Sequence, residues 1–288
     1  MAAWEEAGTY RSCAGHRVFT VEVPARQAET LEPLLVLHGF PTSCFDFHAV
    51  VEAWAQRRRV LLLDFVGFGL SDKPDVRYSV ERYADVAQAF VDAVGVERLA
   101  MVSHDLGDTV GGELLARTLD GTWPVEVTRR VVSNGSIYIA MAQLTAGQQL
   151  LLALPDERLP ASAGIDGPSM AASLSATFSP TSSVDGGELE AAWELIAHHE
   201  GQRLLPRTIR YIEDRRRRED RYTGAIEGHP APLAVVWGTE DPVAVRAMAS
   251  RLCERRPGTP LTWLEGVGHY PMLEAPEAFA AAVGAALG

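Results

Sequence analysis

The sequence predicts an α/β fold in which a mostly parallel sheet is flanked by helices and interrupted by one inserted helical segment. Through the first 135 residues, short continuous apolar runs alternate with helical patterns, which is typical of parallel strands buried on both faces. The same alternation resumes at residue 233, after a long stretch without a convincing strand. We therefore expect a core formed by 1–135 and 230–288, and a helical cap, or lid, over 136–229.

The individual elements follow from these patterns in order. Two short segments at 10–12 and 17–21 flank Ala14 and Gly15, which indicates a β-hairpin. Apolar runs predict six further strands, at 33–37, 59–64, 99–102, 127–133, 233–238 and 260–264. Helical patterns predict helices at 49–54, at 80–94, directly after residue 107 and at the C-terminus.

Composition excludes several classes of function. The 26 basic and 38 acidic residues give a net charge of −12, which argues against nucleic acid as a partner. No apolar run is long enough to span a bilayer, and the first residues lack the pattern of a secretory signal. The scattered cysteines, Cys13, Cys44 and Cys253, indicate reduced thiols. We expect a cytoplasmic protein, a monomer or homodimer, without nucleic-acid or membrane partners.

Two residue types are almost missing from the chain. Lys73 is its single lysine and Asn134 its single asparagine. Because codons for both are AT-rich, this bias indicates a GC-rich, bacterial genome. Lys73 lies in a loop beside Pro74, so we do not expect Schiff-base chemistry at a lysine.

Asp105 is the most informative residue of the sequence. An apolar run ending at Val102 meets a tight turn at 103–107, and a helical pattern follows. This context is typical of a nucleophile elbow, normally written G-x-S-x-G, whose small flanking residues let the backbone pass closely. Here the central residue is an aspartate. A carboxylate can attack an alkyl carbon and form an ester, which favours opening of C–O or C–halogen bonds over acyl transfer.

Three acid–base residues complete a candidate catalytic set. Asp105, Asp241 and His269 each follow a predicted strand, in the order nucleophile, acid, histidine that is known from catalytic triads. Ligands of open α/β sheets bind where strands end, so we expect the three side chains to meet. The backbone N–H groups of Phe40, in His-Gly-Phe-Pro, and of Leu106 are the expected oxyanion donors.

The whole chain resembles the α/β-hydrolase superfamily, in the branch that holds epoxide hydrolases and haloalkane dehalogenases, and within it the group of the mesoderm-specific transcript protein and its bacterial relatives. The stretches that carry this resemblance span nearly the full length: His-Gly-Phe-Pro-Thr-Ser at 38–43, Asp-Phe-Val-Gly-Phe-Gly-Leu-Ser-Asp-Lys-Pro at 64–74, Ser-His-Asp-Leu-Gly-Asp at 103–108, Ser-Asn-Gly at 133–135, Asp-Pro-Val at 241–243 and His-Tyr-Pro at 269–271.

The resemblance leaves two chemistries to separate. Haloalkane dehalogenases hold the halide with indole or amide N–H groups, whereas this chain has Leu106 and Phe40 at the first two matching positions and only Trp193 in the expected cap. Epoxide hydrolases use cap tyrosines to protonate the departing oxygen. Tyr211 resembles one of them in its position, and Tyr138 is a candidate for the second.

The resemblance therefore implies hydrolysis of an epoxide to a vicinal diol through an ester on Asp105, with Tyr211 as acid and with His269 and Asp241 activating water. His38, Tyr138 and Trp193 are candidate pocket residues, the substrate is a small apolar organic molecule, and no metal or cofactor is expected. Two alternatives stay open. One is a haloalkane dehalogenase with unusual halide ligands, and the other is a binding protein without catalysis on the same scaffold.

Overall fold

A single eight-stranded sheet organises the computed structural model, which describes residues 2–288. Its strands run in the order β1-β2-β4-β3-β5-β6-β7-β8. The pairs β1–β2 and β2–β4 are antiparallel, and every other neighbouring pair is parallel. The predicted α/β fold is confirmed, with strands β1 (Thr9–Cys13), β2 (His16–Val23), β3 (Leu34–Leu37), β4 (Val60–Leu63), β5 (Arg98–His104), β6 (Glu126–Ser133), β7 (Leu233–Gly238) and β8 (Leu261–Leu264).

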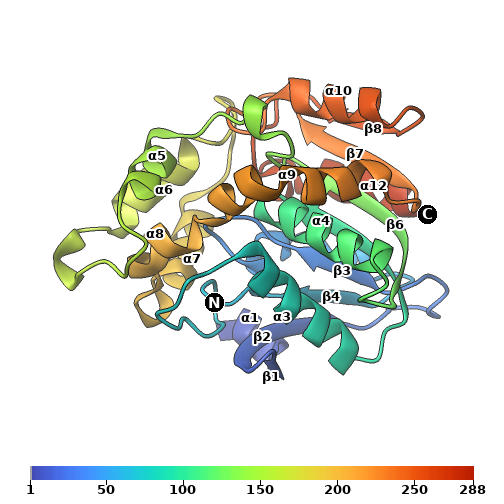
Figure 1. Ribbon diagram of the computed structural model, residues 1–288, viewed down its shortest axis with the longest axis horizontal. Coiled ribbons are helices and arrows are strands. Elements are labelled where there is room, and N and C mark those ends of the chain that lie inside the picture. Colours follow the sequence, from blue (N-terminus) through green and yellow to red (C-terminus); the bar gives the residue numbers. More distant parts are fainter. Residues whose placement is uncertain (1) are drawn as a thin grey trace.

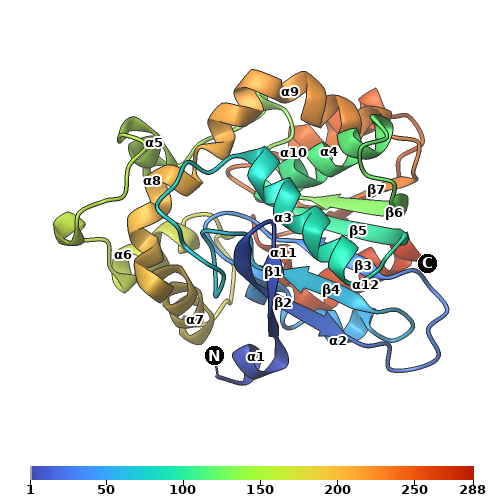
Figure 2. The same ribbon diagram turned by 60° about the horizontal axis from the view of Figure 1, so that its bottom comes forward.

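Helices cover both faces of the sheet (Figures 1 and 2). Helix α4 packs on the central strands β3, β5 and β6. Helix α12 packs on strands β6 to β8 and on α2. The central strands β3, β4 and β7 are buried along their whole length, as the continuous apolar runs predict. The helices outside the region between β6 and β7 are α1 (Ala2–Ala7), α2 (Val51–Trp54), α3 (Val80–Ala93), α4 (Leu106–Leu119), α10 (Arg246–Arg255), α11 (Pro271–Glu274) and α12 (Pro276–Leu287), with the 3-10 helix η1 (Cys44–Phe47).

The helix predicted at 49–54 is shorter than expected. The chain forms η1 first, where the Ser43 hydroxyl accepts a hydrogen bond from the backbone N–H of Phe45, and α2 begins only at Val51. None of the helices in residues 2–288 combines the length and the apolar character that a membrane span requires.

Between β6 and β7 the described chain contains helices and loops but no strand. These elements are η2 (Ile139–Met141), α5 (Ala146–Ala153), η3 (Ala161–Ala163), α6 (Gly167–Ser175), α7 (Gly186–Ala197), η4 (His198–Leu204), α8 (Leu205–Thr208) and α9 (Tyr211–Gly228). Helices α5 to α8 gather at one end of the molecule, whereas α9 runs back across α4 (Figures 1 and 2). The domain boundaries at 136 and 229 stay a prediction. Helix α9 falls between these boundaries in the sequence, but it packs on α4 of the core.

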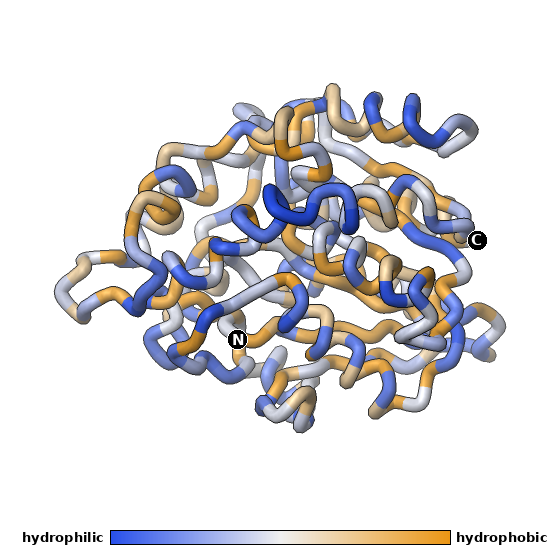
Figure 3. The backbone as a smooth tube through the Cα atoms, in the orientation of Figure 1, coloured by the Kyte–Doolittle hydropathy of each residue, from blue (hydrophilic) through white to orange (hydrophobic). Residues whose placement is uncertain are grey.

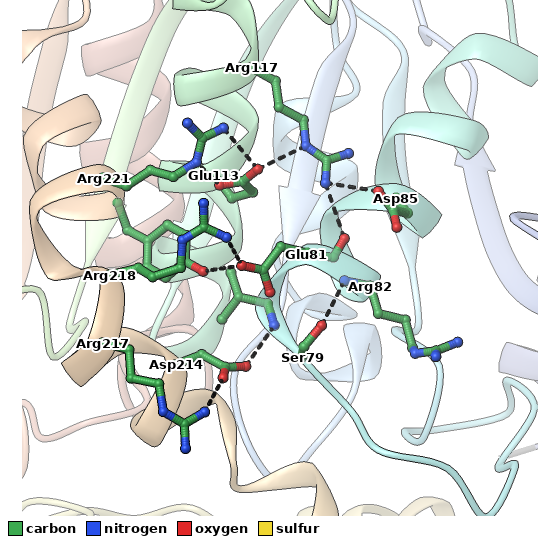
Figure 4. A network of polar contacts seen from close by, with 12 residues as sticks. Ser79, Glu81, Arg82, Asp85, Glu113, Arg117, Asp214, Arg217, Arg218 and Arg221 are labelled. Atoms are coloured by element: carbon green, nitrogen blue, oxygen red, sulfur yellow. Dashed lines mark hydrogen bonds and ion pairs between the residues drawn. The ribbon is translucent and has the colours of Figure 1, made fainter.

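Ion pairs attach α9 to the core. Its arginine-rich run is the most hydrophilic long stretch in the hydropathy view, where it crosses the apolar strands (Figure 3). Arg218 pairs with Glu81 of α3, and Arg221 Nε lies 2.6 Å from a carboxylate oxygen of Glu113 on α4 (Figure 4). Arg215 is buried and donates to the Thr109 hydroxyl at 2.8 Å. These contacts fix the start of α9, and with it Tyr211, over the carboxyl end of β5.

Candidate active site

Asp105 lies in the tight turn between β5 and α4. Its backbone φ is +48°, in the left-handed region that non-glycine residues rarely occupy. The close packing of this turn explains its small neighbour, because a Cβ on Gly107 would lie 2.2 Å from the backbone oxygen of Leu37. The strained backbone projects a buried carboxylate beyond the carboxyl end of the central strand, which is the arrangement of a nucleophile elbow.

Two groups hydrogen-bond one oxygen of the Asp105 carboxylate. The backbone N–H of Phe40 donates to Oδ2 at 2.9 Å, and the Tyr211 hydroxyl donates to the same atom at 3.5 Å. Gly39 allows the Phe40 loop to approach, since a Cβ there would lie 2.7 Å from the ring of His104. Leu106 is the first residue of α4, so its N–H has no partner within the helix. The carboxylate is thus held through Oδ2, which leaves Oδ1 to react.

His269 and Asp241 form the second part of the site. His269 Nδ1 lies 2.8 Å from Asp241 Oδ2, and both residues are buried. The other oxygen of Asp241 accepts backbone N–H groups from Val243 at 2.7 Å and Ala244 at 2.9 Å. A carboxylate held on both oxygens orients the imidazole, so that Nε2 is left free for proton transfer.

Charge decides the protonation of His269. Burial alone would lower its pKa, but the carboxylate of Asp241, and to a smaller extent that of Asp105, outweighs burial and raises the pKa to about 9. The ring is therefore an imidazolium at neutral pH. Loss of the negative charge at Asp105 favours the neutral ring.

We expect Asp105→Asn to lower the pKa of His269 below the value of about 9, because the substitution removes a negative charge that raises it. NMR titration of the histidine ring nitrogens in both proteins measures this pKa directly. An unchanged titration of His269 in the variant would show that the two side chains are not electrostatically coupled.

Tyr211 comes from the inserted segment. It begins α9, is fully buried, and its ring lies 5.8 Å from that of Phe40, centroid to centroid. Burial, followed by the nearby charge of Asp105, raises the pKa of the Tyr211 hydroxyl well above its usual range. The phenol stays protonated at neutral pH and is a hydrogen-bond donor above the carboxylate.

A cavity of about 220 Å³ opens toward this site. Its inner end is lined by Phe40, His269 and Tyr270, and its outer walls come from α5 and α6. Asp105 and Tyr211 do not belong to the lining, yet Phe40 contacts both of them. Phe40 therefore lies where the cavity meets the buried carboxylate.

Three predicted pocket residues lie elsewhere. His38 is fully buried with both ring nitrogens bonded to backbone, at Gly39 O and Phe65 N. The hydroxyl of Tyr138 donates to Glu227 of α9 at 2.8 Å instead of pointing to Asp105. Trp193 of α7 packs beside Gly167. None of the three lines the cavity at His269, so the structure does not bring them to the site.

Sequence reasoning missed three residues that hold the candidate catalytic side chains or the backbone beside them. Asn134 donates to Asp241 Oδ2 at 2.8 Å, and the Tyr270 hydroxyl donates to the Phe40 carbonyl at 3.1 Å. Glu274 accepts the backbone N–H groups on either side of His269, at 3.0 and 3.1 Å. A signal for Asn134 was present, because it is the only asparagine and directly follows a predicted strand.

Comparison with known proteins identifies similar sequences. The alpha/beta hydrolase family matches residues 34–282. "Putative hydrolase LipZ" of Mycobacterium tuberculosis is 36% identical, over 97% of this chain and 95% of its own length. The mesoderm-specific transcript protein of Mus musculus is 28% identical, over 96% of this chain and 84% of its own length. The predicted resemblance is confirmed at the level of the family and this group.

Solved structures agree in fold. An alpha/beta hydrolase fold protein from Burkholderia ambifaria superimposes with a TM-score of 0.78 at 24% identity, and each chain is covered over 96%. Cfl2 from Burkholderia cenocepacia has a TM-score of 0.80 at 19% identity, over 98% of this chain and 95% of its own. At these identities the likeness supports the fold only, and the chemistry has to be inferred from the residues of the site.

Proposed function

Because the chain belongs to the alpha/beta hydrolase family, we propose that it is a hydrolase that opens small apolar epoxides to vicinal diols through an ester on Asp105. One observation carries this proposal. A buried, protonated phenol, that of Tyr211, donates to the same buried carboxylate that the elbow presents. A nucleophile and an acid that meet at one point are what ring opening of an epoxide requires.

In the first step Asp105 Oδ1 attacks a ring carbon of the epoxide. The C–O bond of the ring breaks, and its electron pair goes to the departing oxygen. Tyr211 hydrogen-bonds that oxygen and gives it a proton. The products of this step are a hydroxyalkyl ester on Asp105 and a tyrosinate, whose negative charge replaces the one lost at the carboxylate.

Before the second step the imidazolium of His269 gives its proton to the tyrosinate of Tyr211 through solvent, which leaves a neutral ring. In the second step this neutral ring takes a proton from water, and the hydroxide attacks the carbonyl carbon of the ester. The negative oxygen of the tetrahedral intermediate is Oδ2, which the N–H of Phe40 already holds at 2.9 Å. The ester bond then breaks and the diol leaves, while the proton taken from water stays on His269 and restores the imidazolium. Asp105 is restored as a carboxylate.

Electrostatics couples the two steps. In the free protein the negative charge of Asp105 helps to keep His269 protonated. Formation of the ester followed by reprotonation of Tyr211 removes that charge from the site, so the pKa of His269 is lower when the ring must accept a proton from water. The ring of His269 is therefore more readily neutral after the attack than before it.

Halide release has less support from the site. A halide needs N–H donors beside the reacting carbon, but Leu106 and Phe40 have apolar side chains and Trp193 lies away from the cavity. A phenol suits an epoxide oxygen better than a halide, because the basic alkoxide formed on ring opening must gain a proton, whereas a halide leaves as a stable anion.

We expect Tyr211→Phe to lower kcat for epoxide opening by roughly 10²- to 10⁴-fold, since it removes the general acid. Tyr138→Phe is the matched control, because its hydroxyl bonds Glu227 and not Asp105, and its activity should stay within about threefold of the wild type. The assay uses terminal and internal epoxides together with 1-haloalkanes, and measures diol and free halide. Halide release without diol in the wild-type protein would overturn the proposal.

A further inference from the structure

We propose that the substrate carries an elongated apolar chain whose far end leaves the protein between α5 and α6. This inference rests on the proposed function and adds the shape of its substrate. The space between the catalytic residues and the surface is here called the α5–α6 groove. It is the cavity of about 220 Å³, whose lining runs from Phe40 and His269 to Gly147 of α5 and Ser173 of α6.

The groove leads from the site to the surface. At its inner end Phe40 and His269 are buried, and Met170 and Leu174 of α6 are buried beside them. At its outer end the lining residues are exposed, with Leu150 65% exposed at the tip of the wall. A ligand with its reactive end at His269 therefore has an open path outward.

Two small residues border the outer end of the groove, which is here called the mouth. Gly147 of α5 faces Ser173 of α6, because a Cβ built on Gly147 would lie 3.9 Å from the Ser173 hydroxyl. Both residues are exposed. The two helices thus come close to van der Waals contact at this pair, so a chain that leaves the groove passes beside the pair and not between its two residues.

The chemistry of the walls selects an apolar chain. Apart from His269, the residues that line the groove include no acidic or basic side chain, and its middle is formed by Leu151, Met170, Leu174 and Leu205. A charge in the middle of the groove would lose its hydration without gaining an ion pair. A charge at the far end of a long chain would lie in water beyond Ser173.

Chain length is therefore expected to control both affinity and tolerance of charge. Each added CH₂ that enters the groove should strengthen binding about fourfold, up to the length at which the chain reaches the mouth. Beyond that length binding should level off. A terminal carboxylate should be rejected on short chains and accepted on chains that reach solvent.

The test compares kcat/KM for 1,2-epoxyalkanes of four to sixteen carbons, and for the same chains with a terminal carboxylate, in three proteins. Ser173→Trp fills the mouth, and Ala172→Trp places the same side chain on an exposed neighbour outside the lining. We expect Ser173→Trp to lower kcat/KM at least tenfold for long chains and less than twofold for short ones. Ala172→Trp should match the wild type throughout.

Affinities of the corresponding 1,2-diols, measured by calorimetry, report on the groove without turnover. Epoxide hydrolysis that is independent of chain length, or that Ser173→Trp reduces equally at all lengths, overturns the inference and leaves the proposed function intact. Absence of any epoxide hydrolysis in the wild type overturns the proposed function. In that case a rise of diol affinity with chain length, lost in Ser173→Trp, supports the groove, and a flat series contradicts it.

Discussion

Asp105→Ala is expected to abolish epoxide hydrolysis, with a fall in kcat of roughly 10⁶-fold, the size that follows removal of a nucleophile from a catalytic triad. The carboxylate forms the covalent bond in this mechanism, and no other acidic residue among the described hydrogen bonds meets both Phe40 N–H and Tyr211. Steady-state diol production measures the loss. Circular dichroism and thermal unfolding check that the variant is folded.

Asp108→Asn is the control for this substitution. Asp108 lies three residues further along in α4 and is buried, and burial raises its pKa well above the usual range of a carboxyl. Burial favours its neutral form, and an amide keeps the shape of that form. Its kcat should fall less than tenfold. An equal fall in kcat in Asp105→Ala and Asp108→Asn would indicate that the elbow tolerates no substitution. The loss in Asp105→Ala would then no longer support Asp105 as the nucleophile.

His269→Gln is expected to stop the reaction halfway, after one turnover of the first step. Attack by Asp105 does not need a base, whereas hydrolysis of the ester needs His269 to take a proton from water. Rapid mixing should show consumption of about one equivalent of epoxide per protein, followed by a steady state at least 10³-fold slower than that of the wild type. Stopped-flow and quenched samples separate the two phases.

The ester is expected only if Asp105 is present. The double variant Asp105→Ala, His269→Gln should therefore show no rapid phase. Tyr138→Phe combined with His269→Gln is the matched control and should keep the rapid phase, since Tyr138 bonds Glu227 outside the site. A rapid phase in the variant without Asp105 would assign the attack to another residue.

The positions of the three candidate catalytic residues could be predicted because local sequence determines them. Asp105, Asp241 and His269 each follow a strand whose continuous apolar run identifies it, and a parallel sheet brings such strand ends to one edge. The place of the Phe40 N–H beside Asp105 could be predicted for the same reason, because Phe40 follows β3. Tyr211 was predicted from resemblance alone, and its contact with Asp105 depends on how α9 crosses the core.

Contacts made by the inserted segment could not be predicted. Tyr138 and Trp193 are aromatic residues of that segment, and nothing in their local sequence shows that one bonds Glu227 and the other packs on Gly167. The contacts of His38 could not be predicted either. Both of its ring nitrogens bond backbone groups, and the bond to Phe65 depends on the tertiary structure. The groove between α5 and α6 likewise arises from packing of two helices far from the motifs.

The measurement that tests the central claim most directly is the intact mass of His269→Gln, taken within seconds of mixing with an epoxide and followed by peptide mapping. We expect the protein mass to rise by the mass of one epoxide, with the addition on the peptide that contains Asp105 and absent from the double variant. Formation of diol by this protein at an unchanged mass, or an addition on any other residue, would contradict a covalent ester on Asp105.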